Sequence, residues 1–143
     1  MTIIFSKKCE YGLQACLYLA ANNKGEVYPS DEIAKQLKIP KEFVSKILQS
    51  LTASGLISSK KGKHGGFSLA KDSKKIKLID IVTAIDGLDL FEHCVLGFPN
   101  CSPNTPCPVH YKWGELRTKA YQMLTEETLD VFKDKTLTKI NNL

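Results

Sequence analysis

The stretch SDEIAKQLKIPKEFVSKILQSLTASG, residues 30–55, predicts two short helices joined by a tight turn. Ser30, followed by two acidic residues, can cap a first helix that runs through Leu37. Pro40 suits the first position of the second helix, and Gly55 suits its end. Two short helices joined in this way form a helix-turn-helix, whose second helix can enter the major groove of DNA.

The second of these helices has one apolar and one polar face. Helical spacing directs five apolar side chains inward: Phe43, Val44, Ile47, Leu48 and Leu51. The positions between them carry hydrogen-bond donors and acceptors suited to base edges and phosphates: Lys41, Glu42, Ser45, Lys46 and Gln49. This polar face is the predicted DNA-reading surface.

After Gly55 the spacing changes from helical to strand-like. LISSKK and GFSLAK are typical of strands, and KHGG between them supplies the glycines of a hairpin turn. The lysine-rich segment 60–77 could be an ordinary solvated surface. Because the hairpin directly follows the helix-turn-helix, however, it is better interpreted as a wing that meets phosphates or a narrow minor groove. The residues expected at DNA are Lys60, Lys61, Lys63, His64, Gly65 and Gly66.

Two further amphipathic helices are expected around this motif. Residues 6–21 direct one face inward, consisting of Cys9, Leu13, Cys16, Leu17 and Ala20. Residues 76–87 direct Ile81, Val82 and Ile85 inward and end at Gly87. Cys9 and Cys16 are therefore interpreted as small core residues.

Composition restricts the cellular setting and the chemistry. The chain has 143 residues, 43% apolar content and a net charge of +5. It has no apolar run of the ~20 residues that a membrane span needs, and its start lacks the order of a signal peptide. We therefore expect a cytoplasmic protein, in which an odd number of cysteines, five here, indicates metal or redox chemistry rather than disulfides.

The segment HCVLGFPNCSPNTPCPVHYKW, residues 93–113, concentrates three of those cysteines. They follow the pattern C-x6-C-x5-C and are Cys94, Cys101 and Cys107. Prolines restrict the loop and reduce the entropy lost when the thiols converge. Pro108 suits the first position of a helix, which makes Cys107 its cap and predicts a lowered thiol pKa. His110 lies about one turn further and could reach the same metal ion or cluster.

The spacing of the cysteines bears on the identity of the metal. Zinc sites usually contain close C-x2-4-C pairs, and this segment has none. Iron–sulfur clusters accept wider spacing and, at some iron atoms, histidine in place of cysteine. The spacing modestly favours an iron–sulfur cluster over zinc.

The segment after this loop predicts a long helix with an apolar stripe made of Trp113, Leu116, Ala120, Met123 and Leu124. A helix that leaves a finished domain with such a stripe needs a partner surface, and a second copy of the chain is the simplest one. The alternative is that the helix folds back on its own domain.

The order of these motifs resembles the bacterial iron–sulfur-sensing winged-helix regulators, the family that includes the cluster-assembly regulator IscR and the nitric-oxide sensor NsrR. The resemblance rests on the helix-turn-helix, the wing ending in GGFSLAK, the helix IVTAIDG, and three cysteines followed by CPVH and tryptophan, and it covers the chain from Phe5 to about Leu129. It implies a homodimeric repressor that binds a two-fold symmetric DNA operator and holds one cluster per subunit.

The resemblance also implies ligands. Cys94, Cys101 and Cys107 match the three cluster thiolates. For the fourth ligand, His110 matches the histidine of [2Fe-2S] members, whereas Glu10 matches a carboxylate that [4Fe-4S] members place across the dimer from the partner subunit.

Three departures from the family limit what can be transferred. The first cysteine interval is one residue longer than in well-known members. Lys61 replaces an arginine of the wing and lacks its planar fork, and Ser45 replaces an acidic residue of the second helix. The target sequence can therefore not be taken from those members.

The sequence predicts a mostly α-helical protein with a small β-hairpin wing. Its parts are a winged helix-turn-helix domain (1–87), a cluster-binding loop (88–107), a dimerisation helix (108–124) and a C-terminal extension (125–143). The rival interpretation is a winged-helix regulator with zinc-bound or redox-active thiols. An enzyme or electron-transfer protein is disfavoured because no catalytic triad, phosphate loop or cofactor motif occurs, and no small-molecule substrate is expected.

Overall fold

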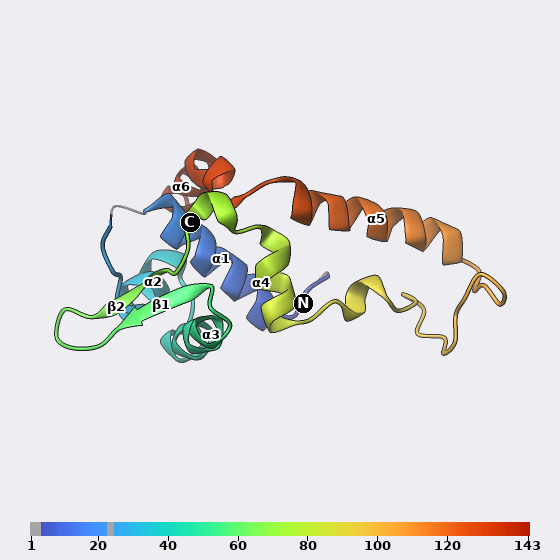
Figure 1. Ribbon diagram of the computed structural model, residues 1–143, viewed down its shortest axis with the longest axis horizontal. Helices are drawn as coiled ribbons and strands as arrows, with labels where there is room; N and C mark the ends of the chain where they lie inside the picture. The colour runs from blue at the N-terminus through green and yellow to red at the C-terminus, as the bar shows by residue number, and fades with distance from the viewer. Residues whose placement is uncertain (1–3, 23–24) are drawn as a thin grey trace.

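The computed structural model describes residues 4–22 and 25–143 and confirms the mostly helical, winged-helix fold class (Figure 1). The helices are α1 (Lys7–Ala21), α2 (Ser30–Leu37), α3 (Lys41–Ala53), α4 (Leu78–Ile85), α5 (His110–Glu126) and α6 (Lys133–Asn141). The strands are β1 (Ile57–Lys60) and β2 (Gly66–Leu69), and three short 3-10 turns complete the chain. No helix within the described ranges is both long enough and apolar enough to cross a membrane.

Helix α1 is the centre of the core and packs against α3, α4 and α6. Ser6 caps its first turn, because the Ser6 hydroxyl accepts a hydrogen bond from the Cys9 amide at 3.1 Å. Cys9 and Cys16 are fully buried on its inner face, which confirms their interpretation as core residues. Gly12 allows α4 to approach closely, since a Cβ atom there would lie 2.3 Å from the Ile85 side chain.

The helix-turn-helix forms as predicted, with small shifts at the helix starts. Ser30 is the first residue of α2 and does not cap it, and Pro40 precedes α3 rather than opening it. Lys38 makes the turn in the left-handed region at φ 55°. The prediction that Phe43 points inward is wrong, because its side chain is 54% exposed and its ring lies 6.0 Å from that of Tyr11 on α1. The other four apolar residues of that face are buried.

The wing is an antiparallel hairpin in which Ile57 pairs with Leu69 and Lys60 with Gly66, leaving a five-residue loop, 61–65. The loop is longer than the tight turn expected from KHGG. Gly66 is required where it lies, because a Cβ atom there would come within 2.5 Å of the Tyr28 backbone. Tyr28 pairs with Phe67 in an additional bridge, so strand β2 of the wing is fixed to the segment before α2.

Helix α5 extends away from the winged-helix core, and the loop 88–109 runs beside it toward the same end of the molecule (Figure 1). Only the last turns of α5 are anchored in the core: Leu124 is 1% exposed and packs with Cys9 and Val82. The chain then returns to the core, where Leu129 is fully buried and Thr128 forms a bridge with Lys77. The segment after residue 124 therefore completes the core.

Candidate metal centre and nucleic-acid interface

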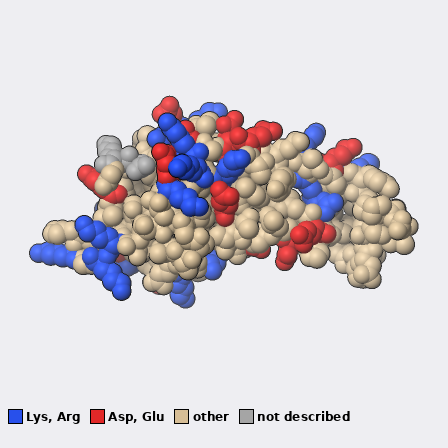
Figure 2. Space-filling model, viewed as in Figure 1, with Lys and Arg blue, Asp and Glu red and all other residues tan. Residues whose placement is uncertain are grey.

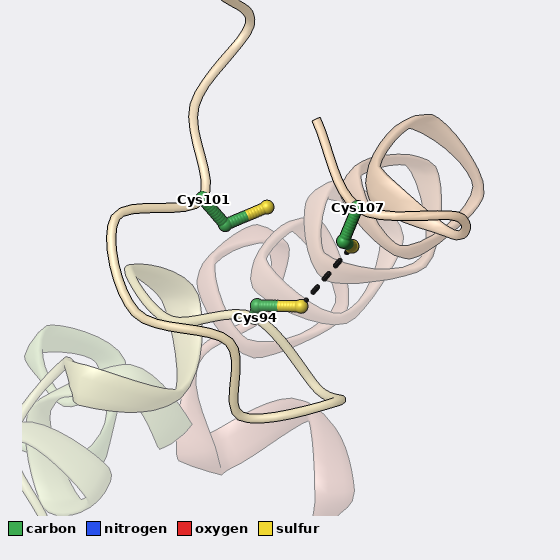
Figure 3. A group of neighbouring side chains, drawn as sticks. All are labelled: Cys94, Cys101 and Cys107. Atoms are coloured by element: carbon green, nitrogen blue, oxygen red, sulfur yellow. Dashed lines mark hydrogen bonds between the residues drawn. The ribbon is translucent and has the colours of Figure 1, made fainter. Parts of the chain in front are cut away.

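The three clustered cysteines converge in space. Their sulfur atoms all lie within 4.8 Å of one another, and the sulfurs of Cys94 and Cys107 are 3.2 Å apart. Figure 3 shows the three side chains pointing toward a common volume from separate parts of the loop. Each residue is partly exposed, so the group is accessible from solvent.

Tight turns bring the cysteines together. Gly97 at φ 78° and Asn100 at φ 58° adopt left-handed conformations that fold the interval between Cys94 and Cys101. The Cys94 carbonyl accepts a hydrogen bond from the Gly97 amide at 3.0 Å, and Ser102 and Thr105 pair across the second interval. The six-residue first interval therefore closes on itself without separating the thiols.

His110 lies next to the cysteine group, beside Cys101. Its Nδ1 atom lies 3.2 Å from the sulfur of Cys101, and its backbone amide donates to the carbonyl of Cys107 at 3.1 Å. The predicted helix start at Pro108 is wrong: α5 begins at His110 and its capping position is Val109. The two residues after Cys107 form a turn, which places His110 itself at the beginning of the helix.

The expected lowering of the Cys107 pKa is also not found. Hydrogen bonding with Cys94 raises the pKa of the Cys107 thiol to about 11, whereas the same contact lowers the pKa of the Cys94 thiol. The physical reason is that Cys107 lies before the turn, outside the capping position, and shares a hydrogen bond with the sulfur of Cys94. In the metal-free protein the first thiolate is therefore expected at Cys94.

The donor set fits a thiophilic metal or cluster. Three thiolates and one imidazole suit zinc and iron–sulfur centres, whereas Mg²⁺ and Ca²⁺ prefer oxygen. Tetrahedral zinc, with bonds of about 2.3 Å to sulfur, requires sulfur atoms about 3.8 Å apart, and the observed spread is compatible with that distance as well. Glu10, the alternative fourth ligand, lies on α1 and forms an ion pair with Lys7 at 3.3 Å.

Trp113, predicted as part of the dimerisation stripe, also has a contact within its own chain. Its indole N–H donates to the carbonyl of His93 at 3.1 Å, and the side chain is only half-exposed. Trp113 lines a cavity of about 270 Å³ that the three cysteines and His110 share with it. Of the rest of the stripe, Leu116 and Met123 are more than half exposed, Ala120 is half-buried and Leu124 is buried against its own chain.

The residues predicted to meet DNA lie on α3 and the wing. Lys41, Glu42, Lys46 and Gln49 are exposed on α3, and Lys60, Lys61, Lys63 and His64 are exposed on the wing, beside the partly exposed Gly65 and Gly66. In Figure 2, lysine side chains gather at the end of the molecule that carries the wing, while the opposite end, which carries the cysteine loop, is mostly uncharged. The candidate DNA-binding surface and the cysteine group therefore lie far apart on the protein.

Two of these polar side chains already have partners. Lys41 forms an ion pair with Asp31 at 2.8 Å, and Ser45 donates its hydroxyl hydrogen to Ser30 at 3.3 Å. An aromatic group next to them was missed from the sequence: Phe43 lies against Tyr11, over whose ring the Lys7 ammonium lies at 5.2 Å. Helical spacing alone could not find this group, because it joins two helices that are distant in sequence.

A winged helix-turn-helix with a basic wing and an extending helix defines a DNA-binding transcriptional regulator. The chain belongs to the Rrf2 family, described as iron-dependent transcriptional regulators, which matches residues 5–135. Regulators of this family bind DNA and are typically dimers, and the homologous proteins are not enzymes.

Individual relatives support the assignment. An HTH-type transcriptional regulator of Aquifex aeolicus is 37% identical over 143 residues, covering 99% of this chain and 93% of the relative. The HTH-type transcriptional regulator IscR of Escherichia coli is 27% identical over 124 residues, covering 87% and 76%. Among solved structures, CymR, the global cysteine regulator of B. subtilis, superposes with a TM-score of 0.79 at 20% identity, covering 94% and 98%.

Proposed function

We propose that the protein is a homodimeric transcriptional regulator, acting as a repressor, whose affinity for a two-fold symmetric operator is set by an iron–sulfur cluster. The observation that carries the proposal is the convergence of the sulfur atoms of Cys94, Cys101 and Cys107, with His110 next to Cys101 at the start of α5. When bound, a cluster there would supply a centre sensitive to redox state, nitric oxide or cluster supply. His110 is the proposed fourth ligand of a [2Fe-2S] cluster, and Glu10 of the partner subunit is the alternative for a [4Fe-4S] cluster.

The proposed DNA contacts follow from exposure and charge. The exposed polar face of α3 would read base edges in the major groove, with Lys46 and Gln49 free of the contacts that hold Lys41 and Ser45. Lysines of the wing would neutralise phosphates, which predicts binding that weakens steeply with salt. Because Lys61 presents a point charge where related wings carry arginine, we expect it to contact phosphate rather than select a groove width.

The dimer would form along the exposed face of α5. Leu116, Ala120 and Met123 share this face, whereas Leu124 belongs to the core of its own chain. A two-fold axis across α5 would present two α3 helices to successive half-sites. It would also place the cysteine group of each chain near the interface, because His110 begins the same helix.

A second candidate function is a regulator with zinc-bound or oxidation-sensitive thiols. Its support is the compactness of the group: the sulfurs of Cys94 and Cys107 are 3.2 Å apart, so a small movement would bring them to the roughly 2.05 Å of a disulfide bond. A single tetrahedral ion would also fit the same four donors. The DNA-binding part of the proposal would then be unchanged.

Metal analysis separates these functions. We would purify the protein without oxygen and measure iron, acid-labile sulfide and zinc per subunit, together with its absorption spectrum. Iron and sulfide near two each support the His110-ligated cluster, and values near four each support the Glu10 alternative. Zinc, or no metal after cluster reconstitution, would contradict cluster sensing and favour the thiol- or zinc-based regulator.

A further inference from the structure

Arg117, the only arginine of the chain, ties α5 to the segment that carries the first cysteine. Its Nη1 atom donates a hydrogen bond to the carbonyl of Phe91 at 2.8 Å. One turn earlier on the same helix, Trp113 donates to the carbonyl of His93. Since Cys94 follows His93 directly, these two hydrogen bonds hold the segment 91–94 against α5, the helix that begins with His110.

A second observation concerns the Nε atom of Arg117. It is the one buried side-chain nitrogen or oxygen without a hydrogen-bond partner among residues 4–22 and 25–143. A buried donor left unpaired is costly, and a cationic donor more so, so such a group usually has a reason. Arg117 lines the cavity of about 270 Å³ that Cys94, Cys101, Cys107 and His110 also line.

The path of the side chain agrees with a role at this cavity. A Cβ atom on Gly114 would lie 3.8 Å from the Nη2 atom of Arg117, so the guanidinium lies back along α5 toward its first turn. The first turn is where His110 contributes its imidazole. The acid that shares the lining of the cavity is Glu92, which adds to the negative charge that three thiolates would bring.

We propose that Arg117 is a positioning residue of the metal centre, which holds the segment 91–94 before and at Cys94 in place and puts a fixed positive charge beside the anionic, thiolate-bound group. The inference rests on the proposed function, because it assumes that the four donors bind metal. Its physical basis is charge: three thiolates bring more negative charge than the positive charge of a divalent ion or a cluster. A fixed positive charge beside them therefore stabilises the metal-bound state. Donors outside the ligand set commonly determine both affinity and ligand orientation.

Cobalt(II) provides a test that does not depend on cluster assembly or DNA. Metal-free protein would be titrated with Co²⁺ without oxygen against a competing chelator, following the thiolate-to-cobalt absorption and the ligand-field bands. For Arg117→Met, which removes charge and donors at similar length, we expect affinity about 10- to 100-fold weaker and altered ligand-field bands. The Co²⁺ affinity of Arg117→Lys, which keeps the charge, is expected to lie between those of Arg117→Met and the wild type.

Lys112→Met is the matched control, because it makes a similar change at an exposed position of the same helix. We expect its Co²⁺ affinity and spectrum to equal those of the wild type. Equal affinities of Arg117→Met and the wild type, or an equal loss in Lys112→Met, would overturn the role of Arg117. If Arg117→Met does not fold without metal, the measurement on Arg117→Lys decides. A Co²⁺ affinity of Arg117→Lys equal to that of the wild type would then overturn the proposal. A wild-type protein without thiolate-to-cobalt absorption would instead contradict the metal centre itself.

Discussion

At the scale of single residues, the exposed ring of Phe43 is the least expected feature of the proposed DNA-binding face. A phenyl ring that is 54% exposed in the first turn of α3 gains little for the core, although it contacts Tyr11. In the major groove, an apolar side chain at such a position can contact the methyl group of thymine. The proposed role of α3 thus gives this ring a partner that the isolated chain lacks.

Phe43→Ala is expected to weaken operator binding while leaving the fold intact. A mismatched base pair typically costs about 1–3 kcal/mol of binding free energy, and we expect the loss of one apolar base contact to cost no more than that. The loss should be largest for sites that carry thymine opposite the ring. Binding isotherms on a duplex selected by the protein from a random pool, at fixed salt, measure the effect. Val44→Ala is the contrasting variant: its side chain is buried in the same turn, so it should lower the free energy of unfolding. A selected duplex bound equally by Phe43→Ala and the wild type would contradict the contact.

The five thiols differ in reactivity because their surroundings differ. Burial raises the pKa of Cys9 and of Cys16 to about 12, while hydrogen bonding lowers the pKa of Cys94. Since the thiolate is the reactive form, limited iodoacetamide treatment of the metal-free, reduced protein near pH 7 should label Cys94 first. Cys107, whose pKa is raised to about 11, should follow only at higher pH. Mass spectrometry of the digested protein gives the order, and labelling of Cys16 before unfolding would contradict it.

At the scale of the elements, helix α5 is buried in part and exposed in part. Its last turns are part of the core through Leu124, whereas Leu116 in its middle and Met123 in its last turn are exposed on another face. Exposed apolar side chains at a spacing of seven residues mark a face that a second helix can cover. The alternative of a helix folded back on its own domain therefore holds for the end of α5 only.

Substitutions on the two faces of α5 should separate dimerisation from stability. Leu116→Glu together with Met123→Glu is expected to give a folded monomer, because both side chains are exposed in a single chain. Leu124→Ala is expected to keep the dimer but to lower the free energy of unfolding by about 2–5 kcal/mol, as for other buried leucines. Sedimentation velocity and urea unfolding report the two quantities. A dimeric double variant would show that the interface lies elsewhere.

The helices and strands were largely predictable from local sequence, but the contacts between them were not. Helical spacing and glycine stops predicted the helix-turn-helix, and Gly55 and Gly87 indeed adopt positive φ. What failed depends on long-range packing: Phe43 lies beside Tyr11 of α1 but remains 54% exposed, whereas Leu124 is buried by its contact with Cys9. A periodic pattern defines a face but not which edge of it is covered.

The same limit applies to the candidate metal centre. The cysteine residues were evident from their clustering, and so was the neighbouring histidine, because few other functions need thiols in a proline-rich loop. The start of α5 was misplaced because Pro108 suits a turn as well as a first helical position. Arg117 was missed, since its bond to Phe91 spans 26 residues and no local pattern indicates it.

At the scale of the whole molecule, a continuous series of packed elements joins the two candidate sites. His110 begins α5, and the last turns of α5 pack on Cys9 of α1 and Val82 of α4. Helix α1 in turn packs along α3, and its Tyr11 contacts Phe43 on the DNA-binding face. A change in the direction of α5 can therefore reach α3 through rigid contacts alone. For a switch of this kind, a coupling of ~1–3 kcal/mol would change operator affinity about 5- to 150-fold.

Weakening the contact between α5 and the core should reduce that coupling without changing metal binding. Val82 is fully buried beside Leu124, and Val82→Ala would leave a small cavity where α5 meets α1 and α4. We expect the ratio of operator affinities with and without bound cluster to move toward one, while iron and sulfide per subunit stay at wild-type values. Ile76→Val, a small loss at another buried position, controls for general destabilisation and should keep the wild-type ratio. If both variants keep that ratio, the coupling does not pass through the end of α5, and the dimer interface becomes the remaining route, because it is the other surface along which α5 can act on α3.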